Sequence, residues 1–230
     1  MSEELIKADE VSKIYRTGDI EVQALHALSL VIGKGEFTAI AGPSGSGKTT
    51  LLNIMSGLDI PTTGRAFLSG RQISGMRGSE LSDFRRDHIG FIFQSYNLIP
   101  VLTVKENIEY IMLLQGVSDK ERSSRVAAIL KDVELEGMES RIPNQLSGGQ
   151  QQRVAVARAM VTEPDIILAD EPTANLDSST GAALLDMMRE LNERKNMTFL
   201  FSTHDTMIME RAKRLVMLKD GQVARDETRE

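Results

Sequence analysis

The sequence predicts an α/β fold, and three observations lead to it. In the last third of the chain, short apolar runs alternate with helical patterns, which is typical of parallel βαβ units. Near the N-terminus, the apolar runs Leu5–Val11 and Val22–Ile32 flank a turn at Gly18 and Asp19, which predicts an antiparallel β part. In the middle of the chain helix formers dominate, so we expect a mostly helical subdomain over residues 95–158.

The individual elements follow from local patterns. Strands are expected where apolar residues run between turns, at Phe37–Ala41, Ala66–Leu68, Ile89–Phe93, Asp165–Ala169, Thr198–Phe201 and Leu215–Leu218. Helices are expected at Lys48–Gly57, Ser178–Arg194 and Asp205–Ala212, and between Val104 and Val133 with a break at Gly116. We therefore expect one domain over residues 1–230, in which 1–94 and 159–230 form the α/β core.

Composition excludes several classes of protein. Lys and Arg number 27 against 33 Asp and Glu, and the formal net charge is −6. That balance gives no protein-wide basic surface, so we expect no nucleic-acid partner. The sequence contains no cysteine, which excludes disulfides and cysteine-ligated metal sites. No run approaches the ~20 apolar residues of a membrane span, and the acidic start Met1–Glu4 lacks the apolar core of a secretory signal. We expect a cytoplasmic protein that reaches a membrane only through a partner.

A glycine-rich segment directly follows the expected strand Phe37–Ala41. It matches the P-loop pattern with Gly42, Pro43, Ser44, Gly45, Ser46, Gly47, Lys48 and Thr49, and Thr50 continues it. Glycines let backbone N–H groups surround phosphate oxygens, and the helix that starts near Lys48 directs its positive end at the same anion. We expect Lys48 to reach the β- and γ-phosphates and the Thr49 hydroxyl to bind Mg²⁺. The segment therefore predicts a nucleoside-triphosphate site.

A second motif places two carboxylates at the end of an apolar strand. The residues are Ile166-Ile167-Leu168-Ala169-Asp170-Glu171. Beside a P-loop, Asp170 is expected to hold Mg²⁺, through water. Glu171 is expected to polarise the attacking water as a general base. The two acidic residues thus predict hydrolysis of the bound nucleotide.

A third motif, Leu146-Ser147-Gly148-Gly149-Gln150, opens a strong helical pattern. A serine hydroxyl, exposed backbone N–H groups and a helix N-terminus together could hold an anion. One P-loop does not need a second anion site in the same chain, so this segment would serve the ATP of a second copy across a two-fold axis. An ordinary serine-capped helix explains the local pattern equally well.

Taken together, these motifs resemble those of the ATP-binding cassette (ABC) family over essentially the whole chain. The resemblance implies a P-loop NTPase (RecA-like) core, ATP and Mg²⁺ as cofactors, and a homodimer that sandwiches two ATP molecules. It implies that Tyr15 stacks on adenine and that Gln94 senses Mg²⁺ and the γ-phosphate. Residues 175–177 resemble the D-loop that crosses the dimer interface, and His204 resembles the histidine that contacts the γ-phosphate.

Less universal segments resemble one branch of this family. Residues 57–64 and 85–107 are similar to ATPase subunits of the lipoprotein-releasing, macrolide-export and cell-division branch. The resemblance implies a separate permease, a location on the inner face of the cell membrane, and a groove beside Gln94 for a permease helix. Apolar residues at Leu98–Leu102 could line that groove or belong to the subdomain core. The alternative is a soluble ABC ATPase of a cofactor-assembly or repair type. A GTPase is disfavoured because the sequence has no Asn-Lys-x-Asp tetrapeptide.

Overall fold

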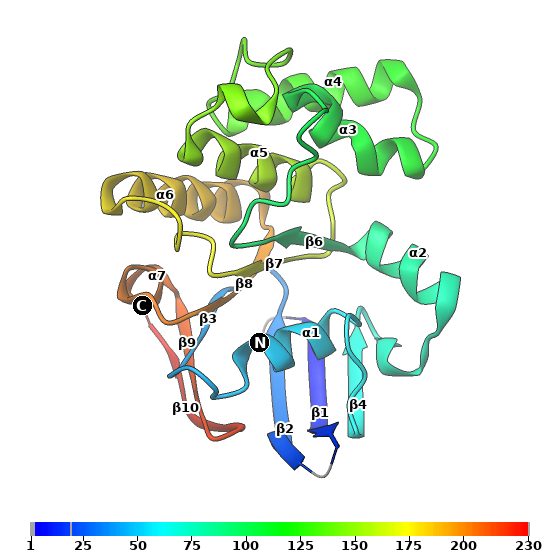
Figure 1. The fold of residues 1–230 in the computed structure, drawn as a ribbon, viewed down its shortest axis with the longest axis vertical. Coiled ribbons are helices and arrows are strands. Elements are labelled where there is room, and N and C mark those ends of the chain that lie inside the picture. The colour runs from blue at the N-terminus through cyan, green and yellow to red at the C-terminus, as the bar shows by residue number, and fades with distance from the viewer. Residues whose placement is uncertain (1–2, 19, 230) are drawn as a thin grey trace.

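The computed structural model describes residues 3–18 and 20–229, so Met1, Ser2 and Asp19 of the predicted start and turn lie outside it. Within this part of the chain, a four-stranded sheet has the order β2-β1-β4-β5 and a six-stranded sheet the order β10-β9-β3-β8-β7-β6. Figure 1 shows both sheets in the lower part of the view and a group of helices above them. The arrangement confirms the predicted P-loop NTPase fold with an antiparallel β part.

The antiparallel sheet is larger than the sequence indicates. Strands β1 (Glu4–Thr17) and β2 (Ile20–Gly33) pair along their whole length, and β4 (Thr63–Leu68) pairs with β1 on its other side. The short strand β5 (Arg71–Gln72) completes the sheet. Both strands extend beyond the predicted apolar runs around the hairpin turn, where their residues are half-buried or exposed and break the apolar pattern.

The second sheet contains the strands expected of βαβ units. Four of them are parallel neighbours, namely β6 (Ile89–Ile92), β7 (Ile166–Asp170), β8 (Thr198–Thr203) and β3 (Phe37–Ala41). Strand β9 (Arg214–Lys219) lies parallel to β3, and β10 (Gln222–Thr228) pairs antiparallel with β9. Strands β3 and β8 are buried along their whole length, as strands covered on both faces are.

Seven α-helices are described. They are α1 (Lys48–Met55), α2 (Gly78–His88), α3 (Val104–Leu114), α4 (Asp119–Asp132), α5 (Gly148–Met160), α6 (Ser178–Lys195) and α7 (Thr206–Arg211), with 3₁₀ turns at Ile73–Gly75 and Pro143–Gln145. The break expected at Gly116 separates α3 from α4. Helix α2 was not predicted, because only Phe84 of its residues is buried and so it shows no apolar periodicity. No helix in the described ranges is long and apolar enough to cross a membrane.

Two apolar clusters hold these elements together. One joins the inner faces of α3, α4, α5 and α6 to the parallel sheet and includes the predicted helix face Val126, Ile129, Leu130 and Val133. The other lies between α1, the antiparallel sheet and the opposite face of the parallel sheet. The predicted boundary at residues 158 and 159 falls inside α5. The helical part therefore packs directly on the sheet that carries the site.

Candidate functional site

The predicted site residues follow strands that end at the same edge of the parallel sheet. Ile92 pairs with Ala169, Asp170 with Ser202, and Ala41 with Thr203. The segments that leave β6, β7, β8 and β3 carry Gln94, Glu171, His204 and the P-loop, respectively. Because carboxyl ends of parallel strands meet at one edge, the register places these four segments side by side.

Close approach of backbone explains two of the P-loop glycines. A Cβ on Gly42 would lie 2.3 Å from the carbonyl oxygen of Leu218. Gly47, the N-cap of α1, has a φ of 98°, and a Cβ there would lie 2.6 Å from the carbonyl oxygen of Ala24. A side chain would therefore collide with rigid backbone at both positions. The loop leaves the first turn of α1 without a side-chain cap, so its N–H groups remain available to an anion.

Lys48 points back into this loop. Its side chain is buried, and Nζ donates hydrogen bonds to the carbonyl oxygens of Gly42 at 2.7 Å and Pro43 at 3.0 Å. Phosphate oxygens are stronger acceptors than neutral carbonyls. The ammonium is thus held next to the position where the loop would bind phosphate. Thr49 is exposed and Thr50 half-buried in the first turn of the same helix.

Three buried polar atoms near the loop have no hydrogen-bond partner in the described part of the chain: Ser46 Oγ, Asp170 Oδ1 and Ser202 Oγ. Burial raises the pKa of the Asp170 carboxyl, and the charge of Glu171 acts in the same direction. A divalent cation nearby would offset both effects. Among the described residues no three His, Cys, Asp or Glu side chains are arranged to hold a metal by themselves. This set fits Mg²⁺, which typically combines one or two carboxylates with substrate phosphates and water.

Glu171 and His204 are in direct contact. His204 Nδ1 lies 2.6 Å from Glu171 Oε1, and the backbone N–H of His204 donates to the same oxygen at 3.0 Å. The Thr203 hydroxyl donates to Glu171 Oε2 at 3.0 Å. Glu171 has a φ of 46°, a conformation that non-glycine residues rarely adopt, and such strain is common at functional sites. Both carboxylate oxygens are therefore held in fixed positions.

The third motif forms a serine-capped helix start. Ser147 Oγ accepts a hydrogen bond from the N–H of Gln150 at 3.3 Å, and Gln150 Oε1 accepts one from the N–H of Ser147 at 3.0 Å. A Cβ on Gly149 would lie 2.4 Å from Thr180 Cγ2, and one on Gly148 would lie 3.1 Å from the Tyr96 hydroxyl. In Figure 1 α5 belongs to the upper helical group, whereas the P-loop, between β3 and α1, lies in the lower half.

The remaining predicted residues lie beside this edge. The Tyr15 ring is 40% exposed, and its hydroxyl lies close to Thr50 of α1. Gln94 has an exposed side chain, and its carbonyl oxygen accepts a hydrogen bond from Asn175 Nδ2 at 2.8 Å. This hydrogen bond connects the segment after β6 with the predicted D-loop (residues 175–177) of the same chain.

Sequence reasoning missed Arg158 as a residue that shapes the site. Its guanidinium donates to the carbonyl oxygens of Asn97 at 2.6 Å and Tyr96 at 2.8 Å. Tyr96 and Asn97 both have positive φ, so the arginine stabilises a strained turn two residues after Gln94. Burial lowers the pKa of the Arg158 guanidinium. No local pattern distinguishes this arginine from the other polar residues of α5.

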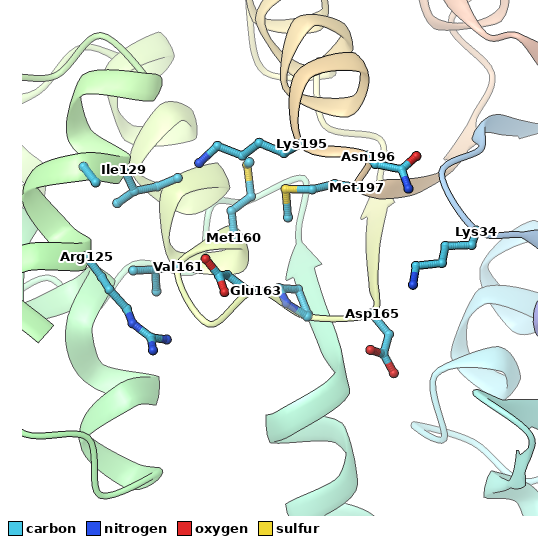
Figure 2. Close-up of a pocket in the computed structure, with 12 residues that line it drawn as sticks. Lys34, Arg125, Ile129, Met160, Val161, Glu163, Asp165, Lys195, Asn196 and Met197 are labelled. Carbon is cyan, nitrogen blue, oxygen red and sulfur yellow. The ribbon is translucent and has the colours of Figure 1, made fainter. Parts of the chain in front are cut away.

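A cavity of about 630 Å³ lies at the other edge of the parallel sheet (Figure 2). Its lining includes Asp165 and Met197, which directly precede β7 and β8. Figure 2 shows Met160 and Met197 between Arg125 on one side and Lys34 on the other. The cavity is separate from the predicted site residues, none of which line it.

Comparison with known proteins identifies the family. The model of the ABC transporter family matches residues 25–174. MJ0796 of Methanocaldococcus jannaschii, described as an uncharacterised ABC transporter ATP-binding protein, is 45% identical over 97% of this chain and 97% of its own. The macrolide export ATP-binding/permease protein MacB of Brucella melitensis is 44% identical over 98% of this chain. The chain spans only 35% of the length of MacB.

A solved structure agrees with these sequence matches. A dimeric MJ0796 cassette in a post-hydrolysis state with ADP and Pi has a TM-score of 0.88 and 44% identity, covering 97% of this chain and 98% of that one. MacB and MJ0796 are consistent with the branch that the sequence resembles. A complete P-loop and the Glu171–His204 contact accompany these matches. The chain therefore belongs to the ABC transporter family, as an ATP-binding and ATP-hydrolysing cassette.

Proposed function

We propose that two copies of this chain close around two MgATP molecules and drive a separate membrane permease in export, extraction or mechanical work. The main support for a dimer is that the glycine-rich starts of α1 and α5 lie apart within one chain (Figure 1). Because the start of α5 lies in the upper helical group and the P-loop in the lower half, the Ser147 segment of a second copy would complete the site. The dimeric MJ0796 structure supports this arrangement.

Hydrolysis would use side chains at this edge of the sheet, of which Lys48, Glu171 and His204 are held by hydrogen bonds. Lys48 would exchange the carbonyl oxygens of Gly42 and Pro43 for phosphate oxygens and offset developing charge. Mg²⁺ held by Thr49, Asp170 and Gln94 would neutralise charge on the β- and γ-phosphates. Glu171 would orient the attacking water and accept its proton. His204, fixed against Glu171 Oε1, would contact the γ-phosphate.

A mixing experiment tests the shared site. We expect Lys48→Met and Ser147→Arg to be inactive alone, because each homodimer lacks one half of both sites. An equimolar mixture should recover up to about a quarter of wild-type turnover, because half of the dimers then contain one intact site. If each chain completed its own site, mixing would restore nothing. As a control for chemistry, Glu171→Gln should reduce turnover by roughly 10²–10⁴-fold and still form the ATP-dependent dimer.

The permease would bind in a groove beside the helical part. The groove has a volume of about 620 Å³ and is lined by Phe91, Phe93, Ile99, Tyr110, Ile111 and Leu114 among others. Tyr110 is 40% and Leu114 54% exposed. Of the apolar residues at 98–102, Ile99 lines the groove, whereas Leu98 packs on the core. Arg158 also lines it and contacts the turn after Gln94, which supports a mechanical link from groove to nucleotide.

Purification from gently solubilised native membranes tests the permease. We expect the tagged chain to recover a permease with few membrane helices and a large outer domain, identified by mass spectrometry. Leu114→Asp should lose it, whereas Val101→Asp, at an 80% exposed position outside the groove lining, should keep it. Recovery of soluble partners alone would favour a soluble ABC ATPase.

A further inference from the structure

The side chain of Tyr15 is held by a carboxylate from a distant part of the chain. Its hydroxyl donates to Asp59 Oδ2 at 2.8 Å, and Lys13 Nζ donates to Asp59 Oδ1 at 2.6 Å. Lys13 Nζ also donates to the carbonyl oxygen of Ile60 at 2.8 Å. Asp59 thus uses one oxygen for the phenol and the other for the ammonium. Its side chain is 25% exposed and that of Lys13 is 13% exposed, so solvent screens the pair only in part.

The segment that carries Asp59 is itself anchored on two sides. The N–H groups of Leu58 and Asp59 donate to the carbonyl oxygen of Asn53 in α1 at 2.8 and 3.1 Å. On the other side, the N–H of Thr62 donates to the carbonyl oxygen of Ser12 at 2.8 Å. The N–H of Ile14 donates to Thr62 Oγ1 at 3.0 Å. Asp59 therefore joins Tyr15 to the helix that begins at the P-loop.

The Lys13 ammonium also lies over one face of the Tyr15 ring. Its Nζ lies 4.9 Å from the centroid of the Tyr15 ring, within cation–π distance. A cation on one face leaves the other face for a planar ligand. Burial opposes ionisation of Asp59, but the hydrogen bonds from Lys13 and Tyr15 outweigh it and hold the pKa of the carboxyl below its ordinary value. Asp59 is thus charged at neutral pH and keeps both partners.

We propose that Asp59, together with Lys13, is a positioning residue that fixes the Tyr15 ring for stacking on the base of the bound nucleotide. The inference rests on the proposed binding of MgATP and on the adenine-stacking role that the resemblance to the ABC family implies for Tyr15. A half-exposed aromatic ring on a strand end would otherwise lose side-chain freedom on binding, and ordering it beforehand removes that cost. Through Tyr15, the Asp59 carboxylate would affect binding of the adenine base. It makes no contact with the P-loop residues that would bind phosphate.

The test compares ATP with inorganic tripolyphosphate, which lacks the base and ribose. Dissociation constants are measured in a Glu171→Gln background, so that ATP is not consumed. Tyr15→Ala should weaken ATP by roughly 5- to 150-fold, the usual range for a lost base–aromatic stack. Asp59→Ala and Tyr15→Phe should each weaken ATP about 3- to 10-fold, because the ring remains but is no longer fixed. Tripolyphosphate affinity should change less than about twofold in all three.

Two further variants sharpen the result. The double variant Tyr15→Phe/Asp59→Ala should lose less ATP affinity than the two single losses combined, because both substitutions remove the Tyr15–Asp59 hydrogen bond. Glu21→Ala, which breaks the exposed Arg16–Glu21 pair of the same hairpin, should leave ATP affinity unchanged. Additive losses in the double variant would overturn the proposal.

The remaining outcomes separate this inference from the role of Tyr15. If Tyr15→Ala weakens ATP selectively but Asp59→Ala and Tyr15→Phe do not, stacking stands and the positioning role of Asp59 is overturned. If Tyr15→Ala leaves ATP affinity unchanged, the stacking role itself fails, and with it this inference. If Asp59→Ala weakens ATP and tripolyphosphate equally, its effect passes through the P-loop and the proposal is overturned.

Discussion

The two glycine-rich helix starts of this chain look alike in sequence and differ in structure. At the P-loop, Gly47 caps α1 in a left-handed conformation with no side-chain cap, and Gly45 also has positive φ. At the start of α5, Ser147 and Gln150 cap each other, and neither glycine of the motif has positive φ. Gly42 and Gly47 of the P-loop combine positive φ with close approach of rigid backbone, whereas an added Cβ at Gly148 or Gly149 would first meet a side chain. Only the start of α1 has no side chain that accepts from the N–H groups of its first turn, so these groups remain available to an anion.

The largest effect is expected from adding a methyl group at the P-loop. Gly47→Ala would place Cβ 2.6 Å from the carbonyl oxygen of Ala24 at a φ of 98°. We expect the free energy of unfolding to fall by about 2–4 kcal/mol. ATP binding should be lost as well. Gly45→Ala is the control, since its φ is similar but nothing lies within 4 Å of the added Cβ. Urea titration measures both, and equal losses would contradict the role of close approach.

A smaller effect of opposite sign is expected at Asp170, beside the P-loop. Its Oδ1 is buried without a partner in the described part of the chain, and its pKa is raised by burial. Asp170→Asn should therefore stabilise the nucleotide-free protein, by on the order of 1 kcal/mol or about 2–4 °C in Tm. The sign follows from linkage, because ionised Asp170 costs stability above its folded-state pKa and the cost disappears as pH falls through it.

Thermal melts of both proteins from pH 8 to pH 4 check this prediction. The advantage of Asp170→Asn should shrink toward low pH as the wild-type carboxyl becomes protonated. Added Mg²⁺ and ATP should stabilise the wild type far more than the variant. An Asp170→Asn protein that is less stable at neutral pH would show that the carboxylate is already satisfied without metal.

The helix start at Ser147 should respond as a cap. Ser147→Ala removes the acceptor for the N–H of Gln150 and should cost about 1 kcal/mol of unfolding free energy. Ser147→Asp, which restores an acceptor, should recover that stability and still fail to support the shared ATP site, because it places a carboxylate against phosphate. Recovery of both stability and turnover in Ser147→Asp would argue against an anion at this position.

The smallest effect is expected at Gly149. Alanine has a higher helix propensity by up to about 1 kcal/mol, but its Cβ would lie 2.4 Å from Thr180 Cγ2. We expect Gly149→Ala alone to change stability by less than about 0.5 kcal/mol. Adding Thr180→Ser removes Cγ2 while keeping the hydroxyl that binds Asp177, so the double variant should be more stable than the wild type. Calorimetry of the single and double variants decides whether the contact or the conformation requires glycine.

Much of the fold and the candidate site could be predicted because the signals are local. Apolar runs such as Phe37–Ala41 and the helix face at Val126–Val133 have periods that are visible within a few residues. The P-loop and the Asp170–Glu171 pair are likewise contiguous. Helix α2 could not be predicted, since its exposed surface carries no apolar period. The exact ends of β1 and β2 also depend on pairing rather than on composition.

The sequence by itself determined which chemical groups the chain carries and in what order, because motifs and periodicity are properties of neighbouring residues. Only the tertiary structure decided which groups meet. Asp59 reaches Tyr15 across 44 positions, and Asn175 reaches Gln94 across 81. Thr180 approaches Gly149 in the same way. Such contacts arise from the register of strands and the packing of helices, and no local pattern in the sequence encodes them.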